Sequence, residues 1–456
     1  MIPPASYSRR SILQAGAGAL GLSLPGWLQL QQRAQAQRGS QRAKACIVIY
    51  CWGGISHHET FDTKPEAPIE IRGSFSSIDS VVPGIRVGEH IPLLAGQMDK
   101  LAVIRSVHHE SSAHGKGMYY NLTGHPPPAP TAAVNLAPSS SHWPSLAAVV
   151  SKIRTAPRGV PGAVRIPYPL VDNGTLQAGE FGGWLGIKHD PIVLRTPAGK
   201  AWGGVSRTLG SEVLDLDKEI DFDRIKSRSR LRESLEQPVS TERDFTGFTH
   251  FRQLATDMLL STGVKHAYNL EREDKRVRAT YGDHIGGQSL LLARRLVEAG
   301  VPIVQVCCSA GDLNGGSGDM WDTHSDNFNR LKNRLLPVFD RGFSSLLVDL
   351  ENRGMLDETL VVMLTDFGRT PKVNGNAGRD HYPSVYSLVM AGGGIRGGQV
   401  YGSSDSKGAF PQNRPCRPED IHATIYDCLG ISPRTVIHDV LGRPFPVSNG
   451  RILPLT

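Results

Sequence analysis

The sequence is poor in cysteine, in long apolar runs and in clustered basic residues, and each shortage excludes a class of protein. Six cysteines in 456 residues, with no C-x-x-C pair, are too few for a disulfide scaffold and wrongly spaced for a thiolate zinc site. Beyond the N-terminal region no stretch approaches the roughly 18 apolar residues of a membrane-spanning helix. The net charge is +7, but it is not gathered into a basic block, so we expect no nucleic-acid partner.

Several well-known catalytic motifs are also missing. The sequence contains no P-loop and no G-x-S-x-G nucleophile elbow. The run "GGGIRG" (Gly392–Gly397) has the spacing of a dinucleotide-binding loop, but "GQVYG" follows it instead of a helical pattern. We therefore do not expect a nucleotide-binding protein or an ordinary serine esterase.

The N-terminal region has the three parts of an export signal. "SRRSIL" contains the pair Arg9 and Arg10, the small-residue apolar stretch "AGAGALGLSLPGWL" follows, and "AQA" (Ala34–Ala36) suits a signal peptidase. The arginine pair is typical of the twin-arginine pathway of bacteria. We expect residues 1–36 to be a twin-arginine export signal peptide. The mature domain, residues 37–456, is then expected to be periplasmic or secreted.

The remaining sequence alternates short apolar runs with helical patterns. Five runs are predicted to be buried strands: Ala45–Trp52, Leu101–Val107, Val301–Cys308, Thr359–Asp366 and Tyr386–Gly394. Helical patterns cover residues 286–300, 327–354 with a break or kink at Pro337, and 417–430. This alternation predicts an α/β domain with a parallel, doubly wound sheet.

Residues from about 126 to 280 differ in composition from the rest of the chain. The stretch begins with "GHPPPAPTAAVNLAPSSSHWP", which is rich in proline, serine and alanine. It continues with the charged segments "DLDKEIDFDRIKSRSRLRESLEQ" and "KHAYNLEREDKRVRATYG", which are typical of solvated helices. We expect an inserted, mostly helical region.

Histidine and carboxylate side chains follow the ends of the predicted strands. They lie in "GGISHHETFD" (His57, His58), "HHESSAHGKG" (His114), "WDTHSDNF" (Asp322, His324), "TDFGRT" (Asp366) and "GRDHYP" (Asp380, His381). Parallel strands end at one edge of a sheet, and imidazole and carboxylate groups are the ligands of zinc and manganese. An Asp after a strand can instead cap the next helix, so "DTH" allows either interpretation. Repetition at one edge favours a metal site.

The long motifs of the chain resemble those of one bacterial family. "WGGISHHETFDTKP", "YNLTGHPP", "WDTHSDNF", "LTDFGRTPKVNGNAGRDHYP" and "GGGIRGGQVYG" are similar to the domain-of-unknown-function 1501 family, whose exported members are numerous in planctomycetes. That family is related to the alkaline phosphatase and sulfatase superfamily. The resemblance implies an α/β fold with a mixed, mostly parallel sheet flanked by helices, and metal ions at the strand ends.

The resemblance also implies ligands. Asp322, His324 and His381 match one metal site of the superfamily, with Asp380 as a further candidate beside His381. Asp366 matches a carboxylate of a second metal site, which is otherwise eroded. Phe367 replaces its histidine, Gly53–Gly54 replace its first aspartate, and His114 stands at the nucleophile position.

Other residues are candidates for roles beside the metal. His57, His58 or His114 could complete the coordination sphere or act as a general base, and Arg369 or Arg379 could bind an anion.

Two functions follow from the eroded pattern. The first is an exported hydrolase of phosphate or sulfate esters that uses a divalent metal ion (zinc, manganese or calcium) and direct attack by water. Its substrate would be a small anionic ester or a sulfated or phosphorylated polysaccharide. The alternative is a non-catalytic, extracytoplasmic binding protein on the same fold, which the changes at Phe367 and His114 favour.

Overall fold

The structure is a computed structural model that describes most of the chain after the N-terminal region. The described residues are 43–128, 135–172, 174–194, 252–259, 261–308 and 320–456, with a few single positions between 224 and 234. They belong to one unit, Ala43–Thr456. The predicted signal peptide and most of the first charged segment of the expected insertion lie outside the described residues. No helix in the described ranges is long and apolar enough to cross a membrane.

A central sheet organises this unit. Within the described residues its order is β14 (Gln399–Tyr401), β4 (Leu101–Val107), β13 (Tyr386–Ala391), β10 (Thr359–Thr365), β1 (Ala45–Cys51), β9 (Ile303–Cys307), β5 (Val164–Ile166) and β8 (Ile192–Val193). β13 is antiparallel to both of its neighbours, and every other pairing is parallel. The five predicted strands are confirmed, but the sheet is mixed and mostly parallel, as the family resemblance implied.

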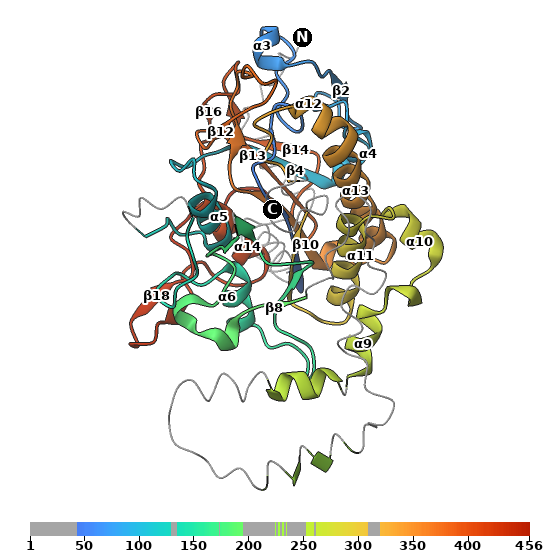
Figure 1. The fold of residues 1–456 in the computed structure, drawn as a ribbon, viewed down its shortest axis with the longest axis vertical. Coiled ribbons are helices and arrows are strands. Elements are labelled where there is room, and N and C mark those ends of the chain that lie inside the picture. The colour runs from blue at the N-terminus through green and yellow to red at the C-terminus, as the bar shows by residue number, and fades with distance from the viewer. Residues whose placement is uncertain are drawn as a thin grey trace, which may run out of the picture. The chain divides into compact units, whose positions relative to one another are not determined.

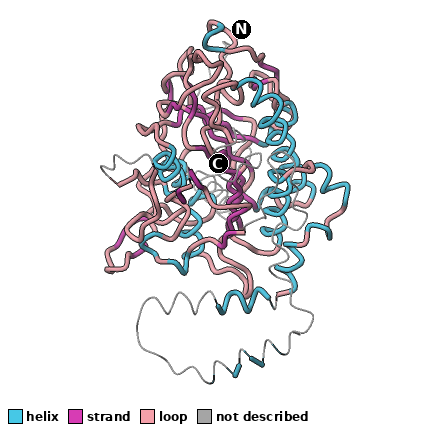
Figure 2. Tube along the Cα trace, in the orientation of Figure 1, coloured by secondary structure: helices cyan, strands magenta, loops and turns pink. Residues whose placement is uncertain are grey.

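Helices cover both faces of the sheet, which explains why its central strands are apolar throughout. All seven residues of β1 and all seven of β10 are buried. Figure 1 shows α11 (Ile285–Glu298) and α13 (Leu336–Asn352) on one side and α5 (His114–Thr123), α6 (Leu146–Ile153) and α14 (Pro418–Cys428) on the other. Figure 2 shows the same layers, with the strands between two groups of helices.

The remaining elements are short. Further α-helices among the described residues are α3 (Ile69–Arg72), α4 (Pro92–Ala95), α9 (Thr262–Tyr268), α10 (Lys275–Thr280) and α12 (Asn327–Arg330), and residues 252–259 are also helical. In the same part of the chain, five two-stranded sheets pair β2 (Ser77–Asp79) with β3 (Arg86–Gly88), β6 (Val171–Asp172) with β7 (Thr175–Leu176), β11 (Gly368–Arg369) with β12 (His381–Tyr382), β15 (Ser403–Ser404) with β16 (Pro411–Asn413), and β17 (Val436–His438) with β18 (Pro444–Pro446).

Two details differ from the sequence prediction. β5 and β8 lie within the stretch expected to be a mostly helical insertion, yet both belong to the central sheet. They have only three and two residues, too few to show a strand pattern. The helix predicted over 327–354 has a π-helical turn at Leu331–Leu335, just before Pro337, because a proline cannot donate the next helical hydrogen bond.

Candidate metal centre at the carboxyl edge of the sheet

The tip of β1 brings the backbone close to the loop that contains Asp322. Gly53 has a φ of +107°, and a Cβ atom added there would lie 2.6 Å from the main-chain nitrogen of Asp322. At Gly54, with a φ of +90°, an added Cβ would meet the Phe367 ring at 2.9 Å. Only glycine fits both positions. A longer side chain at either position, such as the aspartate that the resemblance implies there, would collide with these neighbours.

A short hairpin carries two more residues to the same edge. β11 and β12 pair so that Arg369 lies opposite His381. β12 precedes β13, the one strand of the described sheet that runs in the opposite direction. The amino end of β13 therefore lies beside the carboxyl ends of its neighbours, and His381 reaches the edge from which Asp322 comes.

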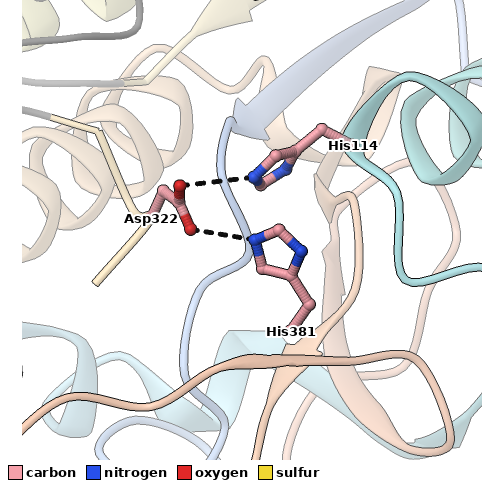
Figure 3. Close-up of side chains that lie close together, drawn as sticks. All are labelled: His114, Asp322 and His381. Atoms are coloured by element: carbon pink, nitrogen blue, oxygen red, sulfur yellow. Dashed lines mark hydrogen bonds and ion pairs between the residues drawn. The ribbon is translucent and has the colours of Figure 1, made fainter. Parts of the chain in front are cut away.

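Asp322 is the centre of the cluster. Its Oδ1 lies 3.1 Å from Nε2 of His324 and 3.1 Å from Nε2 of His381, and its Oδ2 lies 3.4 Å from Nε2 of His114. Arg369 also donates to Oδ1, at 2.5 Å. Figure 3 shows the two carboxylate oxygens of Asp322 facing one imidazole each, from His114 and His381. Four side chains thus meet one carboxylate.

The outer nitrogens of two of these rings are held by acceptors. Nδ1 of His324 lies 2.7 Å from Oδ1 of Asp380, and Nδ1 of His381 lies 2.7 Å from the carbonyl oxygen of Ser112. A carboxylate and a carbonyl only accept, so each Nδ1 carries the proton, and in the neutral rings each Nε2 carries a lone pair. These two Nε2 atoms lie 2.9 Å apart. Two lone pairs at that distance repel unless one ring is protonated or a metal ion binds both.

The outer nitrogen of the His114 ring is also held by an acceptor. Its Nδ1 lies 2.7 Å from Oδ2 of Asp366, while its Nε2 is buried and makes no hydrogen bond. Oδ2 of Asp322 lies 3.4 Å from this nitrogen, without the geometry of a hydrogen bond. Here the third Nε2 atom points to the same carboxylate as the other two.

The spacing of these atoms fits a metal ion. Ligands about 2.0–2.1 Å from a tetrahedral zinc ion lie about 3.3 Å from one another, and the contacts of this cluster are 2.9–3.4 Å. Among the described residues, His114, Asp322 and His381 form a group whose ligand atoms all lie within 4.8 Å of one another. The donor set of imidazole nitrogens and one carboxylate suits a transition metal.

The contacts of the cluster keep the Asp322 carboxylate ionised. Burial alone would raise the pKa of Asp322, but its contacts with three histidines and Arg369 outweigh burial and hold the pKa well below its usual range. Burial opposes protonation of His114, yet the two carboxylates beside it raise its pKa to about 9. The Asp322 contact also raises the pKa of His324, whereas burial lowers that of His381. A proton and a metal ion would compete for Nε2 of His114.

Two of the predicted ligands contact histidines of the cluster on the side away from Asp322. Asp366 accepts a hydrogen bond from His114, and Asp380 accepts one from His324, each on the side of the ring away from Asp322. Both carboxylates therefore hold histidines that face the centre.

The two arginines predicted to bind an anion are buried, with 0% of each residue exposed. Arg369 donates to main-chain carbonyls near the tip of β1, to the carbonyl of Arg379 and to Asp322. Arg379 donates to Glu59 and to three main-chain carbonyls. Their donors are used inside the protein, so this geometry does not fit an anion-binding role for either residue.

His57 and His58 are also placed differently from the prediction. Nε2 of His57 lies 3.0 Å from the carbonyl of Gly408, and Nε2 of His58 lies 2.9 Å from that of Lys407. Burial lowers the pKa of both rings. Neutral rings that donate to the 405–408 turn hold that turn in place, and their described contacts do not include Asp322.

Phe367 stands where the resemblance of the sequence motifs implied a histidine ligand. Its ring centroid lies 5.0 Å from that of His114 and 4.5 Å from that of His381. An aromatic ring packed against both histidines and Gly54 supplies no ligand atom. The position for which the resemblance implies a ligand of a second metal site is therefore filled here by apolar packing.

Sequence reasoning missed Tyr50, Ser112 and Asp172. Tyr50 lies inside an apolar strand but donates to Asp366 at 2.6 Å. Ser112 contributes only a carbonyl, which has no side-chain signal. Asp172 is buried, and burial, together with the charges of Asp366 and Asp322, raises its pKa. The hydroxyl in β1 was the one available signal, since a buried tyrosine usually needs a hydrogen-bond partner.

Fold and cluster together define an α/β protein with a mixed, mostly parallel sheet and a histidine–aspartate centre at its carboxyl edge. The profile of the family described as "Protein of unknown function (DUF1501)" matches residues 43–454. The chain belongs to this family, and the resemblance stated from its motifs is confirmed. No curated protein matches the sequence.

Solved structures with a similar fold include sulfatases and alkaline phosphatases. The PsFucS1 sulfatase from Pseudoalteromonas sp. is 13% identical, with a TM-score of 0.37 over 88% of this chain and 70% of that one. The alkaline phosphatase from the Antarctic bacterium TAB5 is 13% identical, with a TM-score of 0.37 over 85% and 99%. The lipoteichoic acid synthase LtaP from Listeria monocytogenes is 10% identical, with a TM-score of 0.35 over 86% and 74%.

Proposed function

We propose that the protein is a metal-dependent hydrolase of phosphate or sulfate esters with a single metal site. The observation that carries the proposal is the convergence of three imidazole Nε2 atoms on the carboxylate of Asp322. The tautomers of these rings are set by acceptors on their outer sides, which is the usual arrangement of histidines that bind a metal. Asp322, His114, His324 and His381 are the proposed ligands.

The ligand set narrows the choice of metal. Calcium takes six to eight oxygen ligands, whereas imidazole suits zinc and other first-row transition ions. Three nitrogen atoms and one carboxylate therefore favour zinc or manganese among the three ions expected from the sequence. Such an ion acts as a Lewis acid and lowers the pKa of water to near neutrality.

The residues around the ligands would keep the site open on one side. Arg369 anchors Asp322 from the buried side. The side chains of His324 and Asp380 are 45% and 52% exposed, so an anionic ester has access from that direction. With four protein ligands, an ion that takes five or six ligands leaves positions for water and substrate.

The substrate and the location remain predictions from the sequence. A small anionic ester or a sulfated or phosphorylated polysaccharide is the expected substrate, because the motifs resemble a superfamily that acts on such esters. Export through the twin-arginine pathway is expected from the N-terminal segments.

The test is metal content followed by activity. The purified chain would be reconstituted separately with zinc, manganese, cobalt and calcium, and its bound metal measured per chain. We expect about one transition ion per chain, loss of that ion in His324→Ala, and hydrolysis of at least one aryl phosphate or aryl sulfate that disappears with the ion.

His438→Ala is the matched control, because His438 is an exposed histidine on β17. It should retain the metal and the activity. If the unaltered chain retained none of the four ions, or if His324→Ala and His438→Ala retained equal amounts, the proposal would be wrong.

The number of proposed protein ligands, four, also supports the alternative function, a non-catalytic binding protein. A tetrahedral zinc ion with four protein ligands has no open position, as in structural zinc sites. The visible spectrum of the cobalt-substituted protein separates the two functions. Strong tetrahedral bands with no ester hydrolysis would favour a closed, non-catalytic site, whereas weak bands of five- or six-coordinate cobalt would favour the hydrolase.

A further inference from the structure

Asp366 has a fully buried carboxylate that the proposed ligand set does not include. Its Oδ1 accepts from the hydroxyl of Tyr50 at 2.6 Å. Its Oδ2 accepts from the main-chain nitrogen of Gly53 at 3.1 Å and from Nδ1 of His114 at 2.7 Å. Three donors thus surround one carboxylate.

The position of Asp366 is fixed by one face of α5. His114, Gly117 and Asn121 are spaced by three and four residues and lie on the same side of the helix. His114 bonds the carboxylate of Asp366, and Asn121 donates to its carbonyl at 3.0 Å. A Cβ added at Gly117 would lie 2.8 Å from that carbonyl oxygen, so the helix is in close contact with the strand tip. His109 adds a contact of 2.7 Å to the same oxygen.

This placement decides which nitrogen of His114 faces the metal site. The carboxylate of Asp366 accepts a hydrogen bond from Nδ1–H, so the proton of the neutral ring is on Nδ1 and the lone pair is on Nε2. That atom is the one 3.4 Å from Oδ2 of Asp322. A carboxylate on the outer nitrogen of a histidine both orients the ring and makes it a stronger ligand.

Tyr50 determines how the carboxylate of Asp366 is oriented. It lies in the interior of β1, where every residue is buried. Burial, followed by the charge of Asp366, raises the pKa of Tyr50 well above its usual value, so the hydroxyl keeps its proton and donates. With Oδ1 held by Tyr50, Oδ2 is the oxygen that remains for His114.

We propose that Asp366 is not a metal ligand, and that Asp366 and Tyr50 are positioning residues that hold His114 for the metal. This rests on the proposed single metal site and names two residues on which its affinity depends. It departs from the role that the superfamily resemblance implied for Asp366.

The experiment is a cobalt titration of the full chain, followed by visible absorption. We expect Asp366→Asn to bind cobalt about 10–100-fold more weakly than the unaltered protein, the range for loss of such an outer partner. At saturation its spectrum should equal that of the unaltered protein, because the ligands are unchanged. Tyr50→Phe should weaken binding less, with the same saturated spectrum, and His114→Ala should shift the spectrum.

Tyr281→Phe is the matched control. Tyr281 is a buried tyrosine that donates to a buried aspartate, Asp349, at 2.9 Å. This contact is of the same kind as that between Tyr50 and Asp366, but Asp349 belongs to α13. Cobalt affinity should be unchanged in this variant.

Three results would overturn the proposal. A shift of the saturated spectrum of Asp366→Asn as large as that of His114→Ala would make Asp366 a ligand. Unchanged affinity in both Asp366→Asn and Tyr50→Phe would remove the positioning role. Absence of cobalt binding by the unaltered protein would refute the metal site, and this proposal with it. If Asp366→Asn fails to fold, Tyr50→Phe against Tyr281→Phe decides.

Discussion

Charged side chains near the strand ends fall into two groups, those that contact Asp322 and those that hold the surrounding loops together. Arg379 and Glu59 belong to the second group. Their side chains are both 0% exposed, and the guanidinium contacts both carboxylate oxygens, with distances of 2.6–3.1 Å. The pair joins the loop after β1 to the loop that carries His381. A residue predicted to bind substrate thus stabilises the frame of the site.

Glu59→Gln should therefore destabilise the protein strongly. The substitution leaves the Arg379 charge buried without its counter-charge, a change that typically costs about 3–5 kcal/mol. The measurement is the free energy of unfolding from urea denaturation. Glu358→Gln is the control, because Glu358 pairs with Lys44 at 2.7 Å with both side chains more than half exposed. That variant should change stability by less than about 1 kcal/mol, and equal losses in the two variants would contradict this account.

At the scale of elements, the site depends on how closely the tip of β1 approaches the Asp322 loop. The backbone of Gly53 does two things there. Its nitrogen donates to Asp366, and the absence of a side chain lets the Asp322 loop pass within contact distance. The strand tip thus sets the distance between the carboxylate of Asp366, which contacts His114, and the carboxylate of Asp322.

Gly53→Ala should disturb stability and metal binding together. A non-glycine residue at this φ is strained by about 1–3 kcal/mol, and its Cβ would push on the main chain of Asp322. We expect a lower midpoint of thermal unfolding and at least a tenfold loss of cobalt affinity.

Gly84→Ala separates strain from displacement. Gly84 has a φ of +82° and nothing within 4 Å of an added Cβ. It should lower stability through strain alone and leave cobalt affinity unchanged. Equal cobalt affinities in Gly53→Ala and Gly84→Ala would show that the close approach to Asp322 does not matter for the site.

At the scale of the whole molecule, the sequence predicts those strands and site residues whose signal lies within one short segment. β1 and β10 are buried on both faces and form continuous apolar runs in the sequence. Asp322 and His324 follow a predicted strand, and His381 precedes one, at the same edge of the sheet. The pairing of Arg379 with Glu59 could not be predicted, because it joins positions 320 residues apart. The contacts of the Asp366 side chain could not be predicted either, because they depend on how α5 packs against the end of β10.

Buried neutral histidines should make the fold sensitive to acid. Burial lowers the pKa of His109, His125 and His422 to about 4 in each case. In the unfolded chain these rings take up a proton near pH 6.5, whereas in the folded protein they resist protonation until about pH 4. The stability they provide is therefore fully present above pH 6.5 and is lost as the pH falls from 6.5 to 4, by up to about 3 kcal/mol for each ring. His114 acts in the opposite direction, because its raised pKa stabilises the fold at low pH and this contribution is lost as the pH rises through 9.

Urea unfolding between pH 8 and pH 4, with a chelator present throughout, should show stability declining below pH 6.5. His422→Gln removes one of the three rings and should make that decline shallower. An equal decline in both proteins would mean that His422 is not held neutral by the fold.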